Sequence, residues 1–139
     1  MKDFKVAQEV AVTEVKEFIE YHLDEEISEE QVEKDYWDVV KYVMRADLDL
    51  SDKDAPVLKL RKPIKSESGE IVVETVKFRT RITKSQLANL AKGMDLQKDG
   101  LTFANRMTAF FIQQDSVPML DLYGKFDMKV IDQLVGLFQ

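Results

Sequence analysis

Residues 57–79 read VLKLRKPIKSESGEIVVETVKFR, and here the spacing of apolar residues changes from about 3.6 to about 2. Apolar and basic residues alternate at 57–61, a polar turn follows, and apolar residues alternate again over 71–79. Alternation with a period of 2 is typical of a strand with one buried face, so the stretch predicts an antiparallel β-hairpin. Pro63 limits the first strand, and consecutive apolar residues after the turn indicate a bulge or an irregular register.

Two helices are expected before this hairpin. Apolar residues recur at helical spacing over 8–23, and Ser28-Glu29-Glu30-Gln31 has the spacing of a capping box that opens a second helix through Val43. Together they predict an acidic N-terminal helical hairpin over residues 1–50. The polar, helix-breaking residues 47–56 are interpreted as a linker, with a calcium loop considered and set aside because Asp52 stands where such a loop needs glycine.

Three helices are expected after the hairpin. Thr83-Lys84-Ser85-Gln86 has a second capping-box spacing, and its short helix ends at Gly93. A helix follows over 101–113, and Asp127 is predicted to cap the last one. The predicted fold class is therefore α+β, mostly helical with one antiparallel β-hairpin, divided into an N-terminal helical hairpin (1–50) and a β-hairpin with three helices (57–139).

The amino-acid composition disfavours several common kinds of catalytic site. The chain of 139 residues has no cysteine, one histidine (His22) and five glycines that are dispersed along it. Thiolate chemistry, two-histidine metal sites, histidine-based triads and glycine-rich phosphate loops are thereby disfavoured. We expect a non-enzymatic protein without metal or cofactor, and an unrecognised carboxylate site among the 26 acids is the enzymatic alternative.

Charge is distributed unevenly along the chain. Residues 1–56 hold 17 acids and 7 bases, a balance of −10, and residues 57–139 hold 9 acids and 13 bases, a balance of +4, which gives the net −6. A basic run at 59–65 is interpreted as a solvated strand face, so nucleic acid is not an expected partner. No membrane span or signal-peptide core is found, and we expect a cytoplasmic protein.

Apolar residues are in excess near the C-terminus. A large exposed apolar patch commonly marks a protein interface, although the same side chains can equally cover one another as core. The candidate partner-binding residues are Phe103, Phe110, Phe111, Leu120, Leu122, Tyr123, Phe126, Leu134 and Phe138.

The second half also carries an ordered set of features. They are a strand with a proline at 58–64, a turn at Gly69-Glu70, a returning strand that ends at Arg79, a short helix, and Leu120-Asp121-Leu122 before the last apolar run at 130–138. In this order, residues 57–139 resemble the tail assembly chaperone family of long-tailed bacteriophages, with Mu-like and P2-like members. This chain differs in having an acidic segment before the first strand.

The resemblance implies a role in building the phage tail. Such a protein would bind the aggregation-prone tape measure protein in the host cytoplasm, help recruit tail tube protein, and be absent from the finished virion. The alternatives are a tail or head completion protein retained in the virion, or a bacterial adaptor or regulatory module. An apolar surface is compatible with self-association as well as with hetero-complexes.

Overall fold

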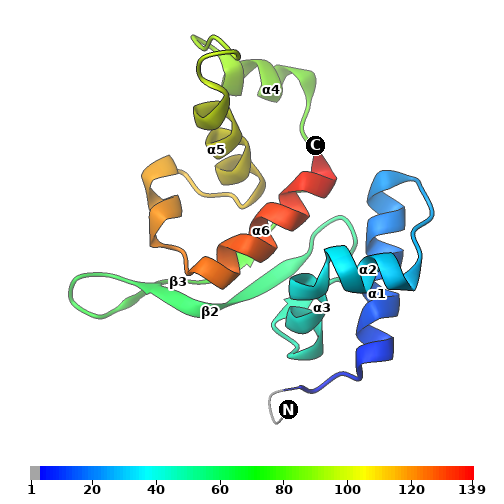
Figure 1. The fold of residues 1–139 in the computed structure, drawn as a ribbon. Helices are drawn as coiled ribbons and strands as arrows, with labels where there is room; N and C mark the ends of the chain where they lie inside the picture. The colour runs from blue at the N-terminus through cyan, green and yellow to red at the C-terminus, as the bar shows by residue number, and fades with distance from the viewer. Residues whose placement is uncertain (1–3) are drawn as a thin grey trace.

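The computed structural model describes residues 4–139 and confirms the α+β class (Figure 1). Its elements in chain order are α1 (Gln8–Leu23), α2 (Glu29–Asp35), α3 (Trp37–Met44), β1 (Leu48–Asp49), β2 (Val57–Lys65), β3 (Ile71–Lys77), α4 (Lys84–Ala91), α5 (Gly100–Phe111), the 3-10 helix η1 (Val117–Leu122) and α6 (Lys125–Phe138). The predicted first helix, the hairpin and the three later helices are all present. The capping box at Thr83 and the positive φ of Gly93 are also confirmed.

The sheet is antiparallel and has the order β1-β2-β3. The predicted register irregularity is confirmed, because the pairing shifts between Lys59↔Thr75 and Ile64↔Val73. The linker expected at 47–56 is corrected, since β1 lies within it and pairs with the start of β2. Leu48 and Leu50 of this segment are 3% and 5% exposed. The polar composition of the segment indicated a free connector, but these two apolar side chains fix it to the core.

The predicted second helix is divided into α2 and α3. Tyr36 interrupts it, with φ −123° and ψ 27°. The freed carbonyl of Asp35 accepts a hydrogen bond of 2.9 Å from the Gln133 side chain of α6. This contact from a helix almost 100 residues away replaces an intrahelical hydrogen bond. The capping and periodicity signals of residues 28–43 cannot reveal it, because they are local.

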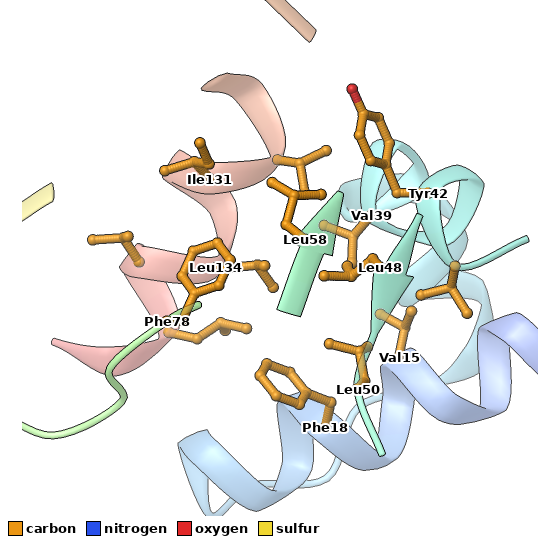
Figure 2. Close-up of a cluster of buried hydrophobic side chains, with 14 of the residues drawn as sticks. Val15, Phe18, Val39, Tyr42, Leu48, Leu50, Leu58, Phe78, Ile131 and Leu134 are labelled. Atoms are coloured by element: carbon orange, nitrogen blue, oxygen red, sulfur yellow. The ribbon is translucent and has the colours of Figure 1, made fainter. Parts of the chain in front are cut away.

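One hydrophobic cluster joins the two halves of the chain. Figure 2 shows Phe18 of α1, Val39 of α3, Leu58 of β2 and Leu134 of α6 converging from different elements. All four side chains are at most 1% exposed. The acidic N-terminal helices therefore cover the sheet and α6 with their apolar faces and keep their carboxylates outside, as amphipathic helices do.

A buried carboxylate ties α3, β2 and α6 together. Asp127 is 1% exposed, and its Oδ1 accepts hydrogen bonds from the Tyr42 hydroxyl (2.7 Å) and the Arg61 backbone N–H (2.9 Å). Its Oδ2 accepts a third from the Lys62 N–H at 3.0 Å. These two amides belong to the part of β2 that has left the ladder, so Asp127 supplies the acceptors that a neighbouring strand would have supplied.

The prediction that Asp127 caps the last helix is wrong. The helix begins at Lys125, Gly124 is the N-cap residue, and Asp127 lies inside the first turn. A Cβ at Gly124 would lie 3.2 Å from the Lys62 side chain, a tight contact that Lys62 would have to relieve by a small shift. Burial, followed by the hydrogen bond to Asp127, raises the pKa of Tyr42 above its ordinary value, so the hydroxyl stays a donor at neutral pH.

A fragment of residues 57–139 should not fold cooperatively on its own. Without α1 and α3, the apolar sides of β2 and α6 lose their cover, and Asp127 loses Tyr42. Urea unfolding of the fragment, followed by circular dichroism beside the full chain, should give a broad transition of low amplitude. A sharp transition like that of the full chain would show instead that residues 57–139 fold independently of the N-terminal helices.

Candidate functional site

The nine candidate partner-binding residues do not form one surface. Phe111, Tyr123, Leu134 and Phe138 lie in the core and are at most 8% exposed, which is the alternative that the sequence left open. Phe103, Phe110 and Leu120 are half-buried against the core. Leu122 and Phe126 are 56% and 60% exposed. The residues accessible to a partner are therefore the half-buried and exposed ones.

Helix α4 and the first half of α5 form an arm that extends from the body of the molecule, at the top of Figure 1. No residue of α4 is buried, and the buried residues of α5 begin only at Met107. Leu87, Leu96 and Leu101 of this arm are 38%, 55% and 78% exposed. The arm thus presents leucines that no other described part of the chain covers.

A groove of about 390 Å³ lies at the base of this arm. Its apolar lining comes from α4, α5 and the start of η1, and consists of Leu90, Ala109, Phe110 and Val117. Its polar lining consists of Arg79, Arg106, Gln113, Gln114 and Asp115. Apolar walls with a few polar groups at the edge are the usual composition of a site that takes an apolar side chain.

Two arginines hold the walls of the groove in place. The Arg79 guanidinium lies 4.6 Å from the centre of the Phe110 ring, and Arg106 Nη1 donates a hydrogen bond of 3.1 Å to the Leu90 carbonyl. The first contact is a cation–π interaction, and the second satisfies a carbonyl in the last turn of α4. Both contacts fix α5 against its neighbours while leaving the groove open.

The backbone at the end of β3 is also joined to α5. The Arg79 N–H donates to the Phe111 carbonyl at 2.7 Å, and Gln113 Nε2 donates to the Lys77 carbonyl at 2.9 Å. The hairpin, whose alternation was clear in the sequence, therefore positions the helix that carries Phe110. The groove therefore combines residues of α4, α5 and η1 with Arg79, which follows β3, and with the loop residues Gln113, Gln114 and Asp115.

Part of this groove was accessible to sequence reasoning. Phe110 was selected as a candidate from the apolar excess near the C-terminus. Arg106 lies four residues earlier on the same face of α5 and was not selected. Leu90 and Val117 were not selected either, because nothing in the local pattern indicates that they line a groove.

The histidine and the acidic side chains are the groups from which a metal site would be built. Among residues 4–139 no group of histidine and acidic side chains is arranged to hold a metal ion. His22 packs between Phe18 and Phe138, and its Nε2 lies 2.6 Å from the Lys53 carbonyl. Burial lowers the pKa of His22 below its ordinary value, which is consistent with a structural, neutral imidazole.

A second recess, of about 420 Å³, lies between α1 and β1. Glu14, Glu17 and Asp49 contribute carboxylates to its lining. Hydrogen bonds from Ser51 hold the pKa of Asp49 below its usual range, so this group is an ionised carboxylate rather than a proton donor at neutral pH. The recess therefore presents three carboxylates together with Lys53.

Three comparisons bear on relationship to known proteins. No family model matches the chain, and no curated protein or solved structure matches it either. Among residues 4–139, no helix combines the length and apolar character needed to cross a membrane. Function is accordingly inferred from the arm, the groove and the sequence resemblance.

Amide hydrogens of α4 should exchange faster than those of α6. Helix α4 buries no side chain, whereas α6 buries seven residues, and weakly packed elements open locally without global unfolding. Hydrogen–deuterium exchange followed by NMR should give α4 protection factors at least about tenfold lower than those of α6. Equal protection in the two helices would mean that the arm is as firmly packed as the core.

Proposed function

We propose that this chain is a non-enzymatic assembly chaperone of a phage or prophage tail. It binds an amphipathic helical segment of the tape measure protein and keeps that segment soluble until tail tube protein surrounds it. The observation that carries the proposal is the uncovered α4–α5 arm with its groove. An apolar surface of this kind on a small chain is characteristic of a partner interface.

The dimensions and chemistry of the groove suit the side chains of a helix. A helix bound in a groove is anchored by apolar residues at i, i+3, i+4 and i+7. The groove of about 390 Å³ accommodates one or two such anchors between Leu90 and Val117. Arg79 and Arg106 at its polar edge are suited to the acidic or carbonyl groups that flank an apolar stripe.

The exposed leucines of the arm extend the apolar area beyond the groove. Leu101 is 78% exposed and Leu96 is 55% exposed, so apolar surface continues along the arm and the loop between its two helices. Chaperoning of a long helical protein requires weak, repeated contacts rather than one closed pocket. Adaptable apolar side chains on a loosely packed arm meet that requirement.

The charge of the remaining chain supports the same role. Residues 1–56 carry a balance of −10, and the apolar faces of their helices are buried in the core. A charged exterior keeps a complex with an aggregation-prone partner soluble. The sequence features that resemble the tail chaperone family fall on β2, β3, α4, η1 and α6, which is a further reason for the proposal.

Co-expression with the tape measure protein from the same genome tests the proposal. The chain should keep the tape measure protein in the soluble fraction and co-purify with it. Val117→Asp in the groove and Leu101→Asp on the arm should each weaken the complex roughly tenfold, because a charge would be buried against apolar side chains. Val72→Asp on β3 is the matched control, since Val72 is 56% exposed and lies outside the arm.

Two outcomes would contradict the proposal. One is the absence of any soluble complex under conditions where the chain itself is folded. The other is equal binding by Val117→Asp, Leu101→Asp and the Val72→Asp control. Mass spectrometry of purified virions separates the chaperone from a retained tail or head completion protein, because the chaperone should be missing from the particle.

A further inference from the structure

A basic recess lies on the opposite part of the molecule from the arm. It encloses about 240 Å³ between α3, β2 and the first turn of α6. Its lining residues are Asp38, Lys41, Tyr42, Arg45, Arg61 and Phe126. None of them lines the groove at the base of the arm, so the two sites can be tested separately.

Positive charge predominates around this recess, although its α3 wall belongs to the acidic half of the chain. Asp38 is shared by Lys41 at 3.3 Å and Lys129 at 3.5 Å. Arg61 pairs with Asp47 at 3.3 Å. Three cations thus meet two carboxylates in these pairs, and Arg45 adds a fourth cation that forms no ion pair within residues 4–139.

Among residues 4–139, Arg45 contacts two aromatic rings and no carboxylate. Its guanidinium carbon lies 5.7 Å from the Phe4 ring and 5.9 Å from the Tyr42 ring. Its Nε is buried and has no hydrogen-bond acceptor among residues 4–139. A buried donor without an acceptor is uncommon in a native protein and calls for an explanation, of which a bound anion is one.

The volume and the lining of the recess limit which kind of group can bind there. A volume of 240 Å³ is smaller than the pocket of a typical small-molecule ligand and corresponds to a single side chain. Phe126, which is 60% exposed, gives the recess an apolar wall for the methylenes of that side chain. The Tyr42 hydroxyl donates to Asp127, so the free donors are those of lysine and arginine.

We propose that this recess binds the carboxylate of a glutamate or aspartate side chain on a protein partner, with Arg45 as the principal donor. A monoanion is favoured over phosphate because Asp38 lies in the lining and Asp127 lies directly behind Tyr42. A nucleic acid is disfavoured because the whole chain carries −6. The inference adds an electrostatic contact that is independent of the apolar groove.

A peptide titration followed by NMR tests this inference on the full chain. The probe is acetyl-Ala-Phe-Glu-Ala-amide, the matched control is the same peptide with Gln in place of Glu, and inorganic phosphate is added in a separate titration. The Glu peptide should shift the amide signals of Lys41, Arg45, Arg61 and Phe126, with weaker binding at higher salt. The Gln peptide should bind at least about fivefold more weakly.

Three variants locate the donor, and a fourth is the control. Arg45→Gln should weaken binding of the Glu peptide roughly five- to tenfold, and Arg45→Lys should recover part of it because the charge is kept. Arg61→Gln offers a second test that preserves the backbone bond from residue 61 to Asp127, and it should weaken binding by a smaller factor. Lys92→Gln, which removes an exposed cation at the end of α4, should leave binding unchanged.

The inference is overturned by either of two kinds of result, which are a failure to recognise the carboxylate and a preference for phosphate. Equal shifts with the Glu and Gln peptides, or unchanged binding in folded Arg45→Gln protein, would show that the recess does not recognise a carboxylate. Tighter binding of phosphate than of the Glu peptide at the same residues would assign the recess to phosphate instead. Neither result depends on whether the apolar groove binds the tape measure protein.

Discussion

The carboxylate of Asp127 is the constraint on which the arrangement of the other elements depends. It is buried, and all of its hydrogen-bond donors come from elsewhere: the Tyr42 hydroxyl on α3 and two backbone N–H groups of β2. Burying a carboxylate is unfavourable unless donors replace its water, and here three donors do so. Its position in the first turn of α6 adds the favourable end of the helix dipole.

The Asp127 carboxylate explains why the β2–β3 hairpin has an irregular register and can still support the helices around it. Between Lys59 and Ile64 the strand β2 leaves its regular pairing with β3, and the Arg61 and Lys62 amides turn to Asp127. The first part of the hairpin then packs under the N-terminal helices, and its C-terminal end leads through Arg79 to the arm. The same geometry leaves α4 at the edge of the core, with no buried residue of its own.

Local sequence signals predicted most of the fold. The features that were missed depend on contacts between residues distant in sequence. The period-2 alternation at 57–79, the helix at 8–23 and the capping box at Thr83 each depend on a few neighbouring residues, and each was confirmed. The break at Tyr36, the strand at Leu48 and the role of Asp127 depend on contacts with residues distant in sequence. A helix-start aspartate looks the same in sequence whether it caps its own helix or binds a strand.

Prediction of the candidate site from the sequence was limited in the same way. The apolar excess after residue 100 was evident, but helical spacing does not say which aromatic side chains fill the core. Phe110 and Phe111 are adjacent, yet one lines the groove and the other is fully buried. The basic recess escaped notice because its lysine and arginines are distributed over two elements from oppositely charged halves of the chain.

A double-mutant cycle on Tyr42 and Asp127 tests the central role of this carboxylate most directly. Urea unfolding should show that Asp127→Asn lowers the free energy of unfolding by about 3 kcal/mol and Tyr42→Phe by about 1 kcal/mol, since Asn presents a donor to a buried donor. The double variant should lose less than the sum by about 1 kcal/mol, and Asp121→Asn on the surface should change little. A loss below about 0.5 kcal/mol for Asp127→Asn, with additive effects, would show that the carboxylate does not hold these elements together.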